Sequence, residues 1–268
     1  MSSLTSEYRY AVGIPTKDRE NVLLDCLNKF FQQTIKPSLI VIANNNSNGK
    51  DVVIPKDAPC PISVVPNLHP VKGISQGNAV ALKKIIEEGF EIAVKWDDDL
   101  FPEPNCMEKL IRWMGEFNVV GGCYPQPGSL VWKGGPLSNM APPDGNKNHI
   151  QFFKWFGEND SIPSPMVSNC LYSSYMYRVS SMMDVGGFVL EHSPIGYRED
   201  TDLTSRMGKC LIDPEAIAIH LACGGGNRGF RPNIRETMME HDGIIFINHM
   251  KKYKINIGSL WKLKEHKE

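Results

Sequence analysis

The stretch around which the chain is organised is Ile92-Ala-Val-Lys-Trp-Asp-Asp-Asp-Leu-Phe-Pro-Glu-Pro104. Its apolar run, Ile92 to Trp96, predicts a buried strand, and three consecutive carboxylates follow that strand. Like charges at one strand end repel unless a divalent cation lies among them, and carboxylate oxygens suit Mg²⁺ or Mn²⁺. Ligands of open α/β sheets also bind at the carboxyl ends of strands. The stretch therefore indicates either a metal-assisted ligand site or a solvated acidic turn in which Asp99 caps the helix expected from Asn105.

Length and composition limit the alternatives. The chain has 268 residues, of which 41% are hydrophobic and 22% charged, and this suits one large α/β domain or two small ones. A net charge of -1 gives no global basic field of the kind that attracts nucleic acid. Seven scattered cysteines without a C-x-x-C pair argue against zinc and favour a reduced, cytoplasmic compartment. We find no pattern of a signal peptide, and no apolar run approaches the roughly 20 residues of a transmembrane helix.

The residues before the acidic stretch predict a βαβ unit. Tyr8 to Ile14 is rich in β-formers, Glu20 to Gln33 carries one apolar helical stripe, and Leu39 to Ala43 is a second apolar run. Two strands joined by a helix within about thirty-five residues are expected to be parallel. A third short strand at Ile62 to Val65 and a helix at Gln76 to Glu88 then lead to the acidic strand. The polar segments after the strands are therefore expected to share one edge of one sheet.

That edge has the residue types needed to bind a nucleotide. Arg19 or Lys17 can pair with phosphate, for which a guanidinium has bidentate geometry. The amides of Asn44 and Asn45 can both donate and accept, as the edge of a nucleobase requires. Taken singly, each segment is also explained by a surface ion pair or a solvated turn. Together with the acidic triplet, they indicate nucleotide-sugar binding.

Three segments of this first half resemble family 2 glycosyltransferases with the type-A glycosyltransferase (GT-A) fold. They are Val12-Gly-Ile-Pro-Thr-Lys-Asp-Arg19, Val41-Ile-Ala-Asn-Asn-Asn-Ser47 and Trp96-Asp-Asp-Asp-Leu-Phe-Pro-Glu-Pro104. The last matches the family's D-x-D motif through Asp97 and Asp99, and the resemblance implies that Asp97 contacts the donor nucleotide and Asp99 a divalent metal. The family commonly has an aspartate after the second strand. This chain has Asn44 there, whose oxygen accepts without a charge, so the nucleobase stays open.

The second half carries a further set of motifs. A carboxylate of Glu199-Asp200 suits a general base that takes the proton of an attacking hydroxyl. The structural alternative is that Asp200 or Thr201 is the N-cap of a helix, with Asp202 in the first turn. Arg198 to Arg206 resembles the family's E-D motif, Tyr177 to Phe188 its preceding segment, and Ile217 to His220 its terminal strand and histidine. The resemblance implies that Asp200 is the base and that His220 contacts metal or diphosphate.

The remaining segments are less informative. Residues 125–148 are dense in Pro and Gly and predict loops with one hairpin near 130–133, where Trp132, like the later Trp155, either stacks on a ligand or packs beneath a loop. Gly224 to Gly229 fits G-x-G-x-x-G, but no strand–helix context supports a dinucleotide site. We interpret that segment as a loop over the diphosphate, with Arg228 or Arg231 reaching phosphate. The lysine-rich tail is either a solvated end or a contact to an anionic membrane or nucleic acid.

We therefore predict a GT-A-like α/β fold: a mostly parallel nucleotide-binding sheet flanked by helices, with a mixed acceptor-binding portion. One catalytic domain is expected over 1–233, with a nucleotide-binding half at 8–104 and an acceptor half at 105–233. A C-terminal helix from Ile234 to about Tyr253 and a basic tail fill 234–268. The predicted function is a metal-dependent transfer of a sugar from a nucleotide-sugar donor, expected to be a UDP-sugar, to an acceptor hydroxyl, and the family resemblance implies that the transfer is inverting. Alternatives are a sugar nucleotidyltransferase and a non-catalytic nucleotide- or carbohydrate-binding protein.

Each predicted site residue has one of three roles. The catalytic residues are Asp200 and Glu199, and the cofactor is Mn²⁺ or Mg²⁺ held by Asp99, Asp97 and His220. The donor-binding residues are Pro15, Thr16, Arg19, Asn44, Asn45, Gly73, Asp97, Asp98 and Arg228. The acceptor class stays open between saccharide, lipid carrier, protein and modified nucleic-acid base. We expect a cytoplasmic protein, with contact to a membrane surface as the alternative.

Overall fold

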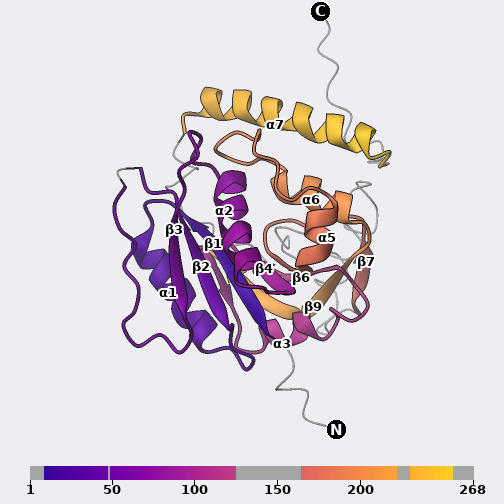
Figure 1. Ribbon diagram of the computed structural model, residues 1–268. Helices are drawn as coiled ribbons and strands as arrows, with labels where there is room; N and C mark the ends of the chain where they lie inside the picture. Colours follow the sequence, from indigo (N-terminus) through magenta and orange to yellow (C-terminus); the bar gives the residue numbers. More distant parts are fainter. Residues whose placement is uncertain (1–8, 48, 125–163, 222–229, 256–268) are drawn as a thin grey trace, which may run out of the picture.

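A computed structural model describes residues 9–47, 49–124, 164–221 and 230–255 (Figure 1). The first half contains β1 (Tyr10–Thr16), α1 (Glu20–Phe31), β2 (Leu39–Asn44), β3 (Ile62–Pro66), α2 (Ile74–Glu87) and β4 (Ile92–Lys95). Strand β1 pairs in parallel with both β2 and β4, and β2 pairs in parallel with β3. The predicted βαβ unit and its parallel sheet are confirmed.

The second half adds mostly antiparallel strands to the same sheet. Its elements are β5 (Leu100–Pro102), α3 (Cys106–Ile111), β6 (Val119–Cys123), β7 (Met166–Ser168), β8 (Tyr175–Arg178), α5 (Val179–Asp184), α6 (Glu199–Met207), β9 (Cys210–His220) and α7 (Pro232–Lys252). The strand order is β3-β2-β1-β4-β8-β6-β9-β5, with β7 beside β9. Strand β8 is antiparallel to β4 and β6, whereas β6 and β9 are parallel. The predicted combination of a parallel half with a mixed half is confirmed.

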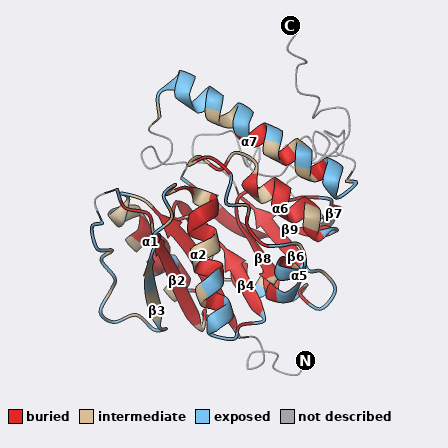
Figure 2. Cartoon of the chain, turned by 45° about the horizontal axis from the view of Figure 1, so that its top comes forward, coloured by how far each residue is buried: buried red, intermediate tan, exposed pale blue. Residues whose placement is uncertain are grey.

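Helices cover both faces of the sheet, because successive strand residues face opposite sides. On one face, Tyr10, Val12 and Ile14 of β1 pack with the apolar residues of α1 and α3. On the other face, Ala11 and its neighbours pack with those of α2, α5 and α6. Figure 2 shows the buried strands between these two helical layers. Helix α7 contacts α6 and lies across the molecule beyond the α2 and α6 layer (Figure 1).

Two predictions of local structure were wrong. The proline-marked turn expected after the acidic triplet contains the short strand β5, whose Leu100 pairs with His220 of β9. Helix α6 begins at Glu199 with Arg198 as its N-cap, so neither Asp200 nor Thr201 is the cap. Asp200 therefore lies in the first helical turn, with its side chain beside the loop that precedes β8.

Several predictions lie outside the described residues. These are the hairpin near 130–133, Trp132, Trp155, the glycine-rich segment 224–229 with Arg228, and the tail beyond residue 255. Within the described ranges, no helix combines the length and the apolar character needed to cross a bilayer. The six described cysteines are buried and unbridged.

Candidate active site

One pocket lies where β1 and β4 end and α6 begins, at the carboxyl ends of the parallel strands, which is where ligands bind in open α/β sheets. It gathers side chains from both halves of the chain, from Pro15 to Asp200. Its lining residues are Pro15, Thr16, Lys17, Arg19, Asn45, Ile74, Lys95, Asp97, Asp98, Asp99, Gly196, Glu199 and Asp200. The three segments predicted to share one edge, namely the loop after β1, the asparagine loop and the acidic triplet, do meet there.

Asp97 points towards the acceptor half. Its Oδ1 lies 3.0 Å from Lys95 Nζ, and its Oδ2 accepts a hydrogen bond of 2.6 Å from the Ser173 hydroxyl. Burial alone would raise the pKa of this carboxyl, but the Lys95 ammonium and the Ser173 hydroxyl outweigh it and hold the pKa below its usual range. Asp97 is therefore a fixed negative charge at neutral pH.

Asp98 and Asp99 point towards the loop after β1. Arg19 pairs with both, through Nη2 to Asp98 and through Nη1 to Asp99 at 3.0 Å. Thr16 donates a hydrogen bond of 2.8 Å to Asp98, and His220 Nε2 lies 3.4 Å from Asp99 Oδ1. Burial raises the pKa of Asp98 to about 7 against the attraction of Arg19. For Asp99, burial is outweighed by the contact with His220, and its pKa is lowered.

The two predicted residues of the asparagine loop lie in different places: Asn45 is in the pocket, and Asn44 binds backbone groups of its own loop. Asn45 lines the pocket, donates to Gly73 O at 3.2 Å and accepts from Asn67 at 2.7 Å. Asn44 instead donates to Lys50 O at 2.9 Å and accepts from the backbone N–H of Asn46 at 2.9 Å, an Asx-type turn. Of the predicted donor-binding residues, Asn44 and Gly73 therefore lie beside the pocket rather than in its lining.

Glu199 and Asp200 enter the pocket from the first turn of α6. Glu199 is buried and lies 3.2 Å from Lys95 Nζ, and burial raises its pKa to about 7. Asp200 accepts the N–H groups of Thr201, at 2.7 Å, and of Ser173. Burial also raises the pKa of Asp200. The Thr201 hydroxyl also donates to Asp200, at 3.4 Å. A carboxylate offers about four acceptor positions, so one remains on Asp200 for a ligand.

Ser173 joins the two carboxylate sites, and sequence reasoning missed it. Its backbone N–H donates to Asp200, its hydroxyl donates to Asp97, and its carbonyl accepts from Lys95 at 2.6 Å. It does so in a left-handed backbone conformation, with φ of 63°, which is uncommon for a residue other than glycine. Lys95 was also missed, although a single cation inside the apolar run of β4 was a visible signal. Ser173 carries no comparable sequence signal.

Ser173→Ala is expected to lower the rate of any reaction at this pocket roughly ten- to a hundredfold. The change removes only the hydroxyl that orients Asp97, and a hydrogen bond to a charged group contributes about 1.5–3 kcal/mol. Alanine tolerates the left-handed conformation no better than serine, so the backbone strain is retained. The measurement is the turnover rate next to that of Ser180→Ala, the same change at an exposed position in α5. Equal rates for the two variants would remove Ser173 from the site.

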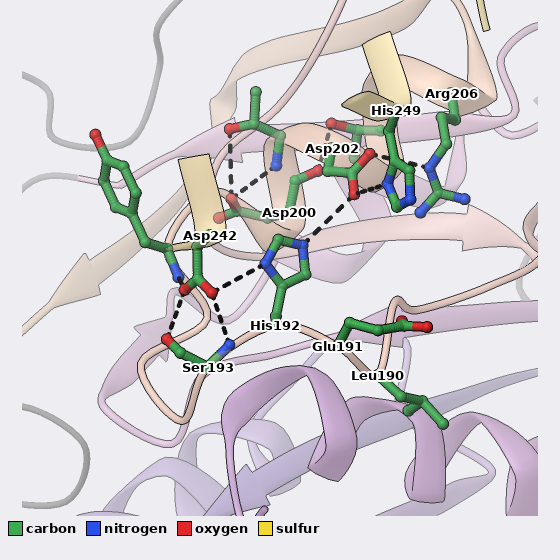
Figure 3. A network of polar contacts seen from close by, with 12 residues as sticks. Leu190, Glu191, His192, Ser193, Asp200, Asp202, Arg206, Asp242 and His249 are labelled. Carbon is green, nitrogen blue, oxygen red and sulfur yellow. Dashed lines mark hydrogen bonds and ion pairs between the residues drawn. The ribbon is translucent and has the colours of Figure 1, made fainter. Parts of the chain in front are cut away.

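Behind α6 lies a second polar cluster, which connects the loop 190–197, α6 and α7 (Figure 3). The buried His192 lies between Asp202 and Asp242, with each ring nitrogen 3.5 Å from a carboxylate oxygen. Asp202 also contacts His249 Nδ1 at 2.8 Å and Arg206 Nε at 3.1 Å. Burial alone would lower the pKa of His192, but the contacts with the two carboxylates have the larger effect and raise the pKa to about 9. The imidazole is therefore protonated at neutral pH.

This cation predicts a loss of stability at alkaline pH. Because the folded-state pKa of His192 lies above the unfolded value of about 6.5, its contribution is complete below about pH 6.5 and disappears as the pH rises through about 9. The difference corresponds to roughly 3 kcal/mol in the free energy of unfolding. In urea unfolding at pH 6, 8 and 10, the free energy of unfolding should fall more steeply with rising pH for the wild type than for His192→Gln. Parallel pH curves for the two proteins would contradict a charged His192.

Comparison with protein families gives a match over much of the chain. The profile described as Glycosyl transferase family 2 matches residues 11–181, which is more than half of the sequence. The match covers β1 to the start of α5 and therefore includes the acidic triplet and Ser173. It ends before Glu199 and Asp200. A comparison with curated proteins found no match.

Solved structures show the same fold at low identity. A crystal structure of S. aureus TarS matches with a TM-score of 0.54 and 13% identity, over 90% of this chain and 40% of that one. A structure of S. aureus TarS 1-349 in complex with UDP matches with a TM-score of 0.55 and 13% identity, over 88% of this chain and 65% of that one. The chain thus spans less than two thirds of either solved chain.

Proposed function

The chain belongs to glycosyl transferase family 2, and from this membership we propose that it transfers a sugar from a nucleotide-sugar donor to an acceptor hydroxyl. The observation that carries the proposal is the shared pocket at the carboxyl ends of the sheet. There the acidic triplet Asp97 to Asp99 faces the Glu199-Asp200 pair across Lys95. Sugar transfer needs both components: groups that hold a nucleotide diphosphate and a carboxylate that accepts a proton.

The donor is assigned to the β1 and β4 side of the pocket. Thr16, Arg19 and Asn45 line that side, and Asp97 is ionised and fixed by two partners. Arg19 can bind a diphosphate by exchanging part of its contact with Asp98 and Asp99 for phosphate oxygens. We propose a UDP-sugar as the donor, supported by the UDP complex of the similar TarS structure. Arg228 stays a prediction outside the described residues.

The residues near Asp99 fit a divalent cation in part. Asp99 Oδ1 and His220 Nε2 lie 3.4 Å apart, close enough for two ligands of one ion, and carboxylate with imidazole suits Mn²⁺. Both oxygens of Asp97 already have partners, and within the described residues no group of three His, Cys, Asp or Glu side chains is arranged as a metal site. We therefore propose that Asp99 and His220 hold the metal, with substrate oxygens completing its shell. When bound, it would neutralise charge on the departing diphosphate.

Asp200 is assigned the role of general base. It lines the pocket, its pKa is raised by burial, and one of its about four acceptor positions is unused by Thr201 and Ser173. Asp200 takes the proton of the acceptor hydroxyl while the acceptor oxygen bonds to the anomeric carbon. The bond from that carbon to the phosphate oxygen breaks, and its electron pair leaves with the nucleoside diphosphate. A single displacement of this kind inverts the anomeric centre.

The test is an assay of both products. The protein is incubated with UDP-, GDP-, TDP- and CDP-sugars, Mn²⁺ and a panel of saccharide, lipid and peptide acceptors. We expect nucleoside diphosphate to be released in step with glycosylated acceptor. Release of pyrophosphate from sugar phosphate and nucleoside triphosphate would instead show a sugar nucleotidyltransferase. Binding of a donor that stays intact with every acceptor would show a non-catalytic binding protein, and either outcome would contradict the proposal.

A further inference from the structure

Helix α7 holds the loop that leads into Glu199 and Asp200. The contact is made by Asp242, a fully buried carboxylate on α7. Its Oδ1 accepts the backbone N–H of Ser193 at 2.7 Å, and its Oδ2 accepts the Ser193 hydroxyl at 2.7 Å and the N–H of Tyr197 at 2.8 Å (Figure 3). One carboxylate therefore binds both ends of the five-residue segment 193–197. The neighbouring His192 adds the charge contact described above.

The opposite side of this segment faces the pocket. Gly196 lines the pocket together with Glu199 and Asp200. Its φ of 57° is left-handed, and a β-carbon there would lie 3.1 Å from Glu199 Cγ and 3.2 Å from Ile74 Cβ. Pro194 packs on the start of α2, where a β-carbon on Gly73 would lie 2.8 Å from Pro194 Cα. The segment 193–197 therefore contacts α7 on one side and forms part of the pocket wall on the other.

Further contacts connect α7 to the start of α6. The Arg198 guanidinium lies 4.8 Å from the Tyr197 ring centroid and 5.3 Å from that of Phe246 on α7. Arg198 has a left-handed backbone with φ of 66° and is the N-cap of α6. One helical turn after Phe246, His249 of α7 contacts Asp202 in the first turn of α6. The turn that carries Glu199 and Asp200 is therefore held by α7 on both sides of these two residues.

We propose that Asp242 is a positioning residue of the active site: from α7, it fixes the 193–197 segment and thereby the place of Asp200 relative to the donor. The inference rests on the proposed function and extends it to a helix outside the family match. The donor-binding residues do not depend on this segment: Thr16 and Arg19 are held by Asp98, and Asp97 is held by Lys95 of β4 and by Ser173. Loosening the segment should therefore slow the chemical step much more than it weakens nucleotide binding.

The test variant is Asp242→Asn, which keeps the shape but loses the charge and one acceptor oxygen. We expect kcat for sugar transfer to fall at least tenfold, while the Kd for nucleoside diphosphate changes less than threefold. The matched control is Glu236→Gln, the same kind of change at an exposed position of α7, with kcat within twofold of the wild type. A kcat of folded Asp242→Asn within twofold of the wild type would overturn the inference.

A second variant tests the inference if Asp242→Asn misfolds, and a second measurement tests it if the proposed function is wrong. Ser193→Ala removes only the hydroxyl that binds Asp242 and is expected to lower kcat about threefold with an unchanged nucleotide Kd. Amide hydrogen exchange measures how firmly the 193–197 segment is held, and this measurement does not depend on enzymatic activity. In Asp242→Asn, exchange at Ser193 and Tyr197 should rise at least tenfold, and unchanged exchange would overturn the inference. Absence of transfer by the wild type would contradict the proposed function, while the exchange result would still decide whether Asp242 holds the segment.

Discussion

Asp200→Asn should abolish sugar transfer and leave donor binding nearly intact. Asparagine has the same shape but only one acceptor oxygen, so it keeps the N–H group of either Thr201 or Ser173, which bind different oxygens of Asp200, and it cannot take a proton at neutral pH. Positioned general bases contribute about 10²–10⁴-fold to rates, and we expect a loss of about a thousandfold in kcat. The measurement is the initial rate of nucleoside diphosphate release in the presence of acceptor, paired with the nucleotide Kd.

The control for this change is Asp184→Asn, the same substitution at an exposed position in α5. Its kcat should match that of the wild type. Turnover by Asp200→Asn within tenfold of the wild type would assign the proton transfer to another group, of which Glu199 is the neighbouring candidate because burial raises its pKa to about 7. Loss of nucleotide binding by Asp200→Asn would place this carboxylate on the donor side instead.

Asp99→Ala should eliminate the part of nucleotide binding that depends on Mn²⁺. The carboxylate is the partner of both His220 and Arg19, so its removal takes away the anionic half of the proposed metal site. We expect the Kd for nucleoside diphosphate in the presence of Mn²⁺ to rise at least tenfold, to the value that the wild type shows with chelator. Titration calorimetry with and without Mn²⁺ measures both values.

Asp57→Ala, at an exposed loop position, serves as the control, and its nucleotide binding should still be strengthened by Mn²⁺. An Asp99→Ala protein whose affinity still increases on addition of Mn²⁺ would contradict the assignment of Asp99. His220→Ala separates the two ligands, because it removes the imidazole and leaves the pair of Asp99 with Arg19.

The parallel half of the fold could be predicted from the sequence because its signals are local. Apolar runs such as Leu39 to Ala43 are buried on both sides, and the stripe of Glu20 to Gln33 packs against the sheet as α1. The observed bounds of β2 and β3 differ from the predicted ones by one residue at one end. Strand ends then determine which loops share an edge, and this is why the residues around Arg19, Asn45 and Asp97 were placed together correctly.

The antiparallel half depends on contacts between distant residues. Strand β5 contains only three residues, ends at Pro102 and exists because it pairs with β9, more than a hundred residues later. The start of α6 was misplaced because Asp200 and Thr201 are good N-cap residues by type, whereas the actual cap, Arg198, is held in a left-handed conformation beside Tyr197 and Phe246. Neither cause can be recognised in a single sequence.

The charged residues of the site were likewise predictable only in part. The acidic triplet was identified from its repulsion, but the sequence does not reveal that Asp97 points to Lys95, whereas Asp98 and Asp99 share Arg19. Lys95, Arg19 and His220 supply the compensating groups, from a strand, a loop and the end of β9. The cluster of His192 and Asp242 has no pattern in the sequence, because its members lie 50 residues apart and meet only through the packing of α7 on α6.

The most direct test of the central claim is a thermal-shift measurement of the wild-type protein with UDP, GDP, TDP and CDP, each with Mn²⁺ and with chelator. A ligand that binds only the folded state raises the apparent stability by mass action, by about 2.7 kcal/mol at a hundred times its Kd. A nucleotide-sugar transferase with its metal at Asp99 should show a rise in Tm with one nucleotide, UDP, that disappears with chelator. No rise in Tm with any of the four nucleotides, with or without Mn²⁺, would contradict the account.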